Sequence, residues 1–429
     1  MQQKKVLIIS YYWPPSGGSG VQRWMYFAKY LNEFGVQPTI ITVDEKYASY
    51  PSKDTSFNKQ VEKVRVYKTK TLEPLRFYSF LKSGKTEKVV PQGNVGGGKK
   101  GILDKVATYI RANFFMPDAR VGWNRYAFQQ AKELITKEHF DLIITTGPPH
   151  STHLVGLKLK QELNIQWMAD FRDPWTEVYY NNLFKRTKRN EEKDKAMELN
   201  VLNKADVILT VGPSMQELLQ NKIIEQKEKV HYIFNGFDEE KFSHLTKNKN
   251  TKQTIRYVGT LTENYPYHSF IEAINQLTSD EIALQIEFIG NIETSVRLEL
   301  TSKCNNTIHF IDNVSHQQAI QYMKDADLLL LLLPYMEHAK IMLTGKLFEY
   351  LATTNPILCI GNKDADASTI VDQLNHSSAF AENEISNITS YIKNQLYSNP
   401  KMFDNHFDIN KFGRKQNTKK LAELIQLYA

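Results

Sequence analysis

Short apolar runs alternate with amphipathic stretches along most of this chain, and that alternation restricts the possible folds more than any other feature. Residues 6–10 and 37–43 are apolar runs typical of strands, and residues 20–34 between them have helical periodicity. A strand, a helix and a second strand form a parallel βαβ unit, because the helix returns the chain to the end of the sheet at which the first strand began. The pattern predicts an α/β chain with doubly wound parallel sheets.

A second series of the same kind begins near residue 255, after a polar segment at residues 247–252. The chain of 429 residues is also longer than one ordinary hydrophobic core serves. We therefore expect two Rossmann-like domains that face each other across a cleft, with ligands at the carboxyl ends of their strands. The expected boundaries are residues 1–245, residues 246–410, and residues 411–429 for a helix that packs back on the junction.

Residues 72–105 interrupt the alternation. This segment is rich in glycine and contains Lys99 and Lys100. Because long irregular segments in compact domains usually carry function, we interpret it as an insertion that covers a cleft or faces a membrane.

The charge and the cysteine content restrict the partners and the compartment. The net charge is +7, but the basic residues are dispersed among acidic ones, which suits anionic phosphates or an anionic membrane surface. The sequence has no basic stripe with interleaved aromatic residues, so we do not expect nucleic acid as a partner. Cys304 and Cys359 form neither a disulfide framework nor a CxxC metal motif, as expected in a reducing cytoplasm.

No stretch of the sequence has the length and hydropathy of a membrane span. The strongest apolar run, residues 328–333, contains six leucines, whereas a spanning helix needs about 20 apolar residues. The first residues also lack the apolar length of a signal peptide. We expect a cytoplasmic protein, with peripheral contact at the inner face of the cytoplasmic membrane as a further expectation.

A loop of small residues follows the first expected strand. Gly17, Gly18 and Gly20 would let backbone amides approach a ligand at the start of the next helix. Arg23 replaces the third glycine of a dinucleotide-binding fingerprint. Asp44 after the second strand nevertheless leaves a dehydrogenase as an alternative function. The remaining alternative is a simple flexible connection.

Two histidines follow the strand expected at residues 141–146. His150 and His153 flank Ser151, which is a natural helix cap. No acidic or cysteine residue is spaced to join them as a metal ligand, so we predict no metal site. A histidine here could donate to a sugar hydroxyl or act on a proton, and the alternative is a capped helix with incidental histidines.

A cluster of charged residues, Asp170, Arg172 and Asp173, follows the next expected strand together with Trp175. Asp173 and Pro174 form a typical helix start, which explains these two residues without a ligand. The other three have no such explanation. Carboxylates and an aromatic ring at the carboxyl end of a strand suit ligands rich in hydroxyl groups.

Residues 344–356 connect two further expected strands and therefore form a crossover helix, with Thr344 and Gly345 at its start. Lys346 and Glu349 are three residues apart on one side of this helix. A cation near the helix start could hold a phosphate, and a carboxylate one turn later could hold a sugar diol. The alternative is a solvated salt pair.

Four motifs occur in a characteristic order over most of the chain: Tyr12-Trp13-Pro14-Pro15 through Gly20, Asp170 through Trp175, Asn235-Gly236-Phe237-Asp238 with Phe242, and Glu349 through Ile357. In this order they resemble the motifs of the retaining nucleotide-sugar glycosyltransferases of the GT-B type, family four. The resemblance implies a metal-independent hexosyltransferase that needs no cofactor and retains the anomeric configuration.

In that family the first domain binds the acceptor, and the second binds the nucleotide-sugar donor. The departing phosphate takes the acceptor's proton on the same face of the sugar. The resemblance implies a glycan or a lipid-linked glycan as acceptor. It also implies a setting in surface polysaccharide assembly at the cytoplasmic membrane.

The resemblance assigns roles to individual residues. Glu349 would bind the ribose hydroxyls of the donor, whereas Gly345 and Lys346 would meet its diphosphate. The expected donor-binding residues are Gly17, Gly18, Gly259, Thr260, Thr344, Gly345, Lys346 and Glu349. The expected acceptor- or sugar-binding residues are His150, His153, Asp170, Arg172 and Asp173. The expected catalytic residues are His150, Lys346 and Glu349.

Three positions depart from the family pattern. Ile341 stands where the family has its first glutamate, Thr354 replaces a glycine, and the loop after Gly259 lacks the usual basic residues. The last departure makes Lys346 the expected phosphate cation. Because this glutamate is missing, a noncatalytic protein that binds nucleotide sugars or glycans remains the second hypothesis. A dehydrogenase is the third.

Overall fold

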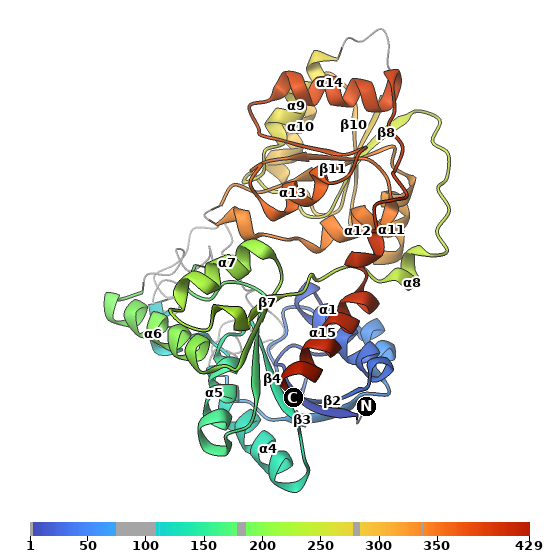
Figure 1. Cartoon of the computed structure of the whole chain (residues 1–429). Helices are drawn as coiled ribbons and strands as arrows, with labels where there is room; N and C mark the ends of the chain where they lie inside the picture. Colours follow the sequence, from blue (N-terminus) through green and yellow to red (C-terminus); the bar gives the residue numbers. More distant parts are fainter. Residues whose placement is uncertain (1–2, 74–108, 111, 178–185, 278–283, 337) are drawn as a thin grey trace. The chain divides into compact units, whose positions relative to one another are not determined.

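Figure 1 shows the computed structural model, which describes residues 3–73, 109–110, 112–177, 186–277, 284–336 and 338–429. The insertion predicted at residues 72–105 lies almost entirely outside these residues. The chain divides into two compact units. The N-terminal unit comprises Met1–Phe234 and Lys415–Ala429, and the C-terminal unit comprises Asn235–Arg414.

The described part of the N-terminal unit contains a seven-stranded parallel sheet with the strand order β3-β2-β1-β4-β5-β6-β7. The strands are β1 (Lys4–Ile9), β2 (Val36–Val43), β3 (Arg65–Thr69), β4 (Leu142–Gly147), β5 (Trp167–Phe171), β6 (Val207–Thr210) and β7 (Val230–Tyr232). The chain proceeds from β1 outward to β3 and then returns to the other side of β1 with β4. This reversal creates a topological switch point between β1 and β4, where doubly wound sheets bind ligands.

Helices cover both faces of this sheet (Figure 1). On one face, Met25 of α1 and Ile425 of α15 share a hydrophobic core with Val6 and Ile144 of the strands. On the other face α5 packs against β4, because a right-handed crossover to the opposite side of β1 reverses the face. The helices are α1 (Ser19–Tyr30), α4 (Asn124–Lys137), α5 (Ser151–Leu163), α6 (Lys188–Lys204), α7 (Pro213–Lys222) and α15 (Arg414–Tyr428).

The described part of the C-terminal unit contains a six-stranded parallel sheet with the order β10-β9-β8-β11-β12-β13. The strands are β8 (Gln253–Val258), β9 (Leu284–Ile289), β10 (Ile308–Ile311), β11 (Leu328–Leu332), β12 (Ile357–Ile360) and β13 (Ser378–Phe380). The strand order reverses between β8 and β11, so this sheet has a second switch point. Together the two parallel sheets confirm the predicted fold class of two Rossmann-like units.

Two groups of helices cover the faces of the second sheet (Figure 1). Phe270, Val296 and Ile388, from α9, α10 and α14, share one core with the strands, and α11, α12 and α13 cover the opposite face. The helices are α8 (Glu239–Phe242), α9 (Tyr267–Gln276), α10 (Thr294–Lys303), α11 (His316–Asp325), α12 (Gly345–Thr353), α13 (Asp366–Asp372) and α14 (Ile385–Lys393). Within the described residues, no helix combines the length and the apolar character needed to cross a membrane.

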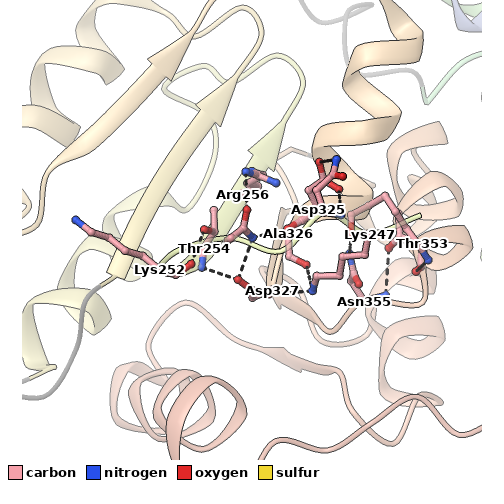
Figure 2. Close-up of polar contacts among 12 residues, drawn as sticks. Lys247, Lys252, Thr254, Arg256, Asp325, Ala326, Asp327, Thr353 and Asn355 are labelled. Carbon is pink, nitrogen blue, oxygen red and sulfur yellow. Dashed lines mark hydrogen bonds and ion pairs between the residues drawn. The ribbon is translucent and has the colours of Figure 1, made fainter. Parts of the chain in front are cut away.

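The polar segment at residues 247–252 runs along the beginnings of β8 and β11, where side chains fasten it (Figure 2). The Lys247 ammonium lies 2.9 Å from the Asp327 carboxylate and donates to the carbonyl of Ala326. Asp327 also accepts a hydrogen bond from the backbone amide of Thr254, and the backbone amide of Asn248 donates to Asp325. These contacts fix where β8 begins and thereby set its register against β11.

The helix α12 ends in an unusual conformation. Thr354 caps it with φ +60°, in the left-handed region that normally suits glycine. A β-branched residue is strained there, because its Cβ approaches the backbone closely. Thr354 is the position at which the sequence departs from a family glycine.

We expect Thr354→Gly to stabilise the protein. The relief of left-handed strain is about 1–2 kcal/mol, and the greater freedom of glycine in the unfolded chain offsets about 0.5–1 kcal/mol of it. The net gain of about 0.5–1 kcal/mol should raise Tm by about 1–3 °C in thermal unfolding. Thr353→Gly is the matched control and should lower Tm, because Thr353 is buried and helical. An unchanged or lower Tm for Thr354→Gly would contradict the inference that the left-handed conformation of Thr354 is strained.

Candidate functional site

The start of α12 lies at the switch point of the C-terminal unit and has no side-chain cap. Thr344 occupies the N-cap position, but its side chain makes no capping hydrogen bond, and the first turn contains no acidic residue. The Thr344 hydroxyl oxygen is buried without a hydrogen-bond partner among the described residues. At Gly345 a Cβ would meet nothing within 4 Å. A helix start with uncapped amides carries partial positive charge and favours an anion.

Lys346 extends from the start of α12 to the end of β8. Its ammonium lies 3.8 Å from the centre of the Tyr257 ring. A Cβ at Gly259 would come within 2.9 Å of the ammonium, and Gly259 has φ +135°. Only glycine therefore permits this approach. The surrounding protein atoms lower the pKa of Lys346 to about 7 by desolvation, and the nearby carboxylate of Glu349 partly opposes the shift.

Glu349 lies one turn further along α12, and its carboxylate is only 19% exposed. Its Oε1 is 2.8 Å from Nε2 of His316, the first residue of α11. Lys346 and Glu349 therefore do not form the solvated salt pair that was the alternative for this helix. One packs against the end of β8, and the other contacts the beginning of α11.

In the N-terminal unit, Arg172 joins the loops that follow β1 and β4. Its guanidinium donates hydrogen bonds to the carbonyls of Gly147, Pro148 and Gly20. Gly18 caps α1 with φ +93°, and a Cβ there would meet nothing within 4 Å. Arg172 thus holds the start of α1, which follows the loop of small residues, beside the end of β4 and near the histidines at the start of α5.

His150 and His153 are buried beside this switch point, and both rings stack on aromatic residues. His150 lies parallel to Trp175 at 5.2 Å between ring centres, and His153 stacks on Phe171 at 4.5 Å. Burial lowers the pKa of His150 to about 3 and that of His153 well below its usual value, and the charge of Arg172 adds to both effects. Both imidazoles are therefore neutral near pH 7.

The ring nitrogens of the two histidines leave hydrogen-bonding capacity unused. His153 Nδ1 lies 2.9 Å from the hydroxyl of Thr145. Both ring nitrogens of His150 and Nε2 of His153 are buried without a hydrogen-bond partner among the described residues. One unpaired nitrogen of each ring is directed at Gly147, the last residue of β4. Neutral imidazoles in this position can donate to or accept from a hydroxyl group.

The structure separates Asp170 from Asp173. Asp170 is fully buried, and its carboxylate accepts hydrogen bonds from Arg23 at 3.2 Å, the Trp24 indole at 2.6 Å and the Thr146 hydroxyl at 2.8 Å. A ligand hydroxyl would have to compete with these three donors. Asp173 is exposed, and the expected helix start at this residue is absent from residues 172–177.

The described residues contain no group of three or more His, Cys, Asp or Glu side chains placed to hold a metal ion.

Comparison with known proteins adds a family and a fold. Residues 93–241 match the family model described as Glycosyltransferase Family 4. HepE of Anabaena, solved with UDP-glucose, has 14% identity, with 99% of each chain covered and a TM-score of 0.57. The catalytic domain of starch synthase IV from Arabidopsis thaliana, solved with ADP and acarbose, has 11% identity, with 100% of this chain and 99% of that chain covered and a TM-score of 0.57. No protein of curated function matches the sequence.

Over residues 93–241 the chain is similar to family 4 glycosyltransferases, and its fold is the GT-B fold. At identities this low, the solved structures show the fold alone, and the family model matches only residues 93–241. The expected donor-binding residues fall into two groups. Gly259, Thr344, Gly345, Lys346 and Glu349 gather at the switch point of the C-terminal unit, with exposed Thr260 following Gly259, whereas Gly17 and Gly18 belong to the loop after β1.

The expected acceptor-binding residues lie near the other switch point. His150, His153 and Arg172 meet around Gly147. Their contacts with a substrate remain predictions, as do those of the donor residues. Sequence reasoning did not find His316 beside Glu349, because 33 residues separate them and only the packing of α11 on α12 brings them together.

We expect Asp170→Asn to destabilise the protein strongly. Arg23 is buried and would lose its counter-charge, which typically costs about 3–5 kcal/mol. Urea unfolding followed by tryptophan fluorescence measures the loss. Asp173→Asn is the matched control and should change the free energy of unfolding by less than about 0.5 kcal/mol. If Asp170→Asn unfolds at the wild-type urea concentration but loses activity, Asp170 acts on the substrate instead.

Proposed function

We propose that the protein transfers a hexosyl group from a nucleotide-diphosphate sugar to a glycan or lipid-linked acceptor, with retention of configuration and without a metal. The observation that carries this proposal is the uncapped start of α12, whose second residue, Lys346, directs its ammonium to Gly259 at the end of β8. HepE was solved with UDP-glucose and starch synthase IV with ADP, which supports a nucleoside diphosphate as the ligand class.

The C-terminal unit would bind the donor. Its diphosphate would accept hydrogen bonds from the first amides of α12 and from the Thr344 hydroxyl, which lacks a partner within the described structure. Lys346 would supply the positive charge. Glu349, one turn later, would accept hydrogen bonds from the ribose hydroxyls, since a carboxylate can accept from both hydroxyls of a diol.

In the proposed reaction, the bond between the anomeric carbon and the phosphate oxygen breaks while the acceptor oxygen bonds to that carbon on the same face. The acceptor's proton passes to the departing phosphate. Negative charge therefore grows on the diphosphate in the transition state. The helix start and Lys346 are placed to stabilise this charge, and their preorganised positions make the stabilisation effective.

The N-terminal unit would bind the acceptor. His150 and His153 are neutral and have unpaired ring nitrogens among the described residues, so they suit sugar hydroxyls better than a charged group. The stacked rings of Phe171 and Trp175 fix the orientation of the two imidazoles. The net charge of +7 is compatible with work at an anionic membrane, which is where a lipid-linked acceptor in surface polysaccharide assembly would lie.

A noncatalytic nucleotide-sugar-binding protein is the second candidate. Ile341 favours it, because the family has a glutamate at this position and here an apolar residue ends a short 3₁₀ turn, Ala339–Ile341. Formation of a glycosylated product from a nucleotide sugar would exclude this candidate. Binding without turnover over a panel of donors and acceptors would support it.

We expect Lys346→Ala to reduce kcat/KM by about 100- to 1,000-fold, as the loss of one preorganised charge-stabilising group does. Glu349→Ala should mainly raise KM for the donor, by about 10- to 100-fold, because hydrogen bonds to a charged group contribute about 1.5–3 kcal/mol. Steady-state transfer assays with a donor found in a thermal-shift screen measure both effects.

Lys363→Ala is the control for these assays. Lys363 is an exposed lysine of the same unit that pairs with Glu384, so its loss should leave transfer unchanged. All three variants should melt near the wild-type temperature. Wild-type turnover by both Lys346→Ala and Glu349→Ala would overturn the proposed donor site.

The lowered pKa of Lys346 makes donor binding dependent on pH. A lysine is charged below its pKa, so with a pKa of about 7 the free protein loses the charge as the pH rises above neutrality. Affinity for UDP-glucose or another nucleotide sugar that binds should therefore fall about 10- to 30-fold between pH 6 and pH 8.5. Lys346→Met should bind weakly with little dependence on pH. Equal pH dependence in both proteins would assign the effect to another group.

A further inference from the structure

His316 connects Glu349 to a second charged residue. It is the first residue of α11, and a capping box formed by Ser315 and Gln318 fixes this helix start. Its Nε2 lies 2.8 Å from Oε1 of Glu349, and its Nδ1 lies 3.3 Å from the ammonium of Lys241. These residues come from α8, α11 and α12 of the C-terminal unit.

The two contacts determine which ring nitrogen of His316 carries the proton. A lysine ammonium can only donate hydrogen bonds, so Nδ1 must accept from Lys241. The neutral imidazole then carries its proton on Nε2 and donates it to the carboxylate of Glu349. Each group in the series Lys241, His316 and Glu349 donates to the next.

This series fixes the orientation of the Glu349 carboxylate. One donor occupies Oε1, which stops the carboxylate from rotating freely about its last bond. A carboxylate accepts about four hydrogen bonds, so Oε2 and a second position on Oε1 stay available for ligand hydroxyls. A carboxylate held in place loses less freedom when it binds a diol, and the binding is correspondingly stronger.

We propose that His316 is a positioning residue for the donor ribose. It acts through Glu349, whose carboxylate it orients, and Lys241 fixes the tautomer of the His316 ring. The inference rests on the proposed function, because it requires Glu349 to bind ribose hydroxyls. A surface ion pair of similar length would add at most about 1 kcal/mol to stability and would not distinguish between ligands. The discriminating property is therefore dependence on the ribose hydroxyls.

Isothermal titration calorimetry tests this property. The ligands are UDP, ADP and GDP, the 2′-deoxy form of each, and inorganic pyrophosphate, which has no ribose. The proteins are wild type, His316→Ala, His316→Gln, Glu349→Ala and the double variant His316→Ala with Glu349→Ala. His268→Ala is the matched control, because His268 is a half-exposed histidine of the same unit, also 2.8 Å from a glutamate.

Wild type should bind a ribonucleotide more tightly than its 2′-deoxy form. His316→Ala should lower the ribonucleotide affinity about tenfold and reduce that preference, while pyrophosphate affinity stays within about twofold. His316→Gln should recover part of the loss, because its amide can donate to Glu349. Once Glu349 is replaced by alanine, removal of His316 should have little further effect. His268→Ala should behave as wild type.

Equal losses for ribonucleotide, 2′-deoxynucleotide and pyrophosphate would overturn the positioning role of His316, and so would no loss at all. If Glu349→Ala lowers the ribose preference but His316→Ala does not, only this inference fails. If Glu349→Ala leaves the ribose preference unchanged, or wild type binds none of the nucleotides, the proposed donor site fails and this inference fails with it.

Discussion

The approach of the Lys346 side chain to the backbone at Gly259 holds the start of α12 against the end of β8. It is possible only because residue 259 has no Cβ, and the Tyr257 ring replaces part of the hydration that the ammonium loses. The lowered pKa of Lys346 shows that the replacement is incomplete. A cation that is partly desolvated beside an uncapped helix start gains more from an anion than an exposed lysine would. The electrostatics of this switch point thus follow from one backbone contact.

The switch point of the N-terminal unit also has a cation, the guanidinium of Arg172, but backbone carbonyls already accept its hydrogen bonds. Arg172 donates to backbone carbonyls of both neighbouring loops, so it ties them together and leaves little capacity for an anion. What remains there is neutral and aromatic, with His150 and His153 stacked beside Trp175. The two sheets have the same order in their first six strands, yet they present different chemistry at equivalent switch points. One suits a diphosphate, and the other suits hydroxyl groups.

Periodicity made most of the fold predictable, because strands and helices leave different spacings of apolar residues. The strand expected at residues 37–43 coincides with β2, whereas β13 was not predicted. β13 has only three residues, too few to show an alternation. Side-chain roles were less predictable, because their partners are distant in sequence. Asp170 is paired with a residue 147 positions earlier, which nothing in its own motif indicates.

The replacement of the family's first glutamate by Ile341 changes the charge balance of the C-terminal unit. Ile341 is partly buried and contributes no charge, so the negative group that the structure places beside Lys346 is Glu349. The charge of Glu349 is in turn partly compensated by the hydrogen bond from His316. The start of α12 is therefore more positive than it would be with a glutamate at position 341, which favours an anion there. The same replacement removes a carboxylate from this turn, so in the proposed reaction groups elsewhere would orient the transferred sugar.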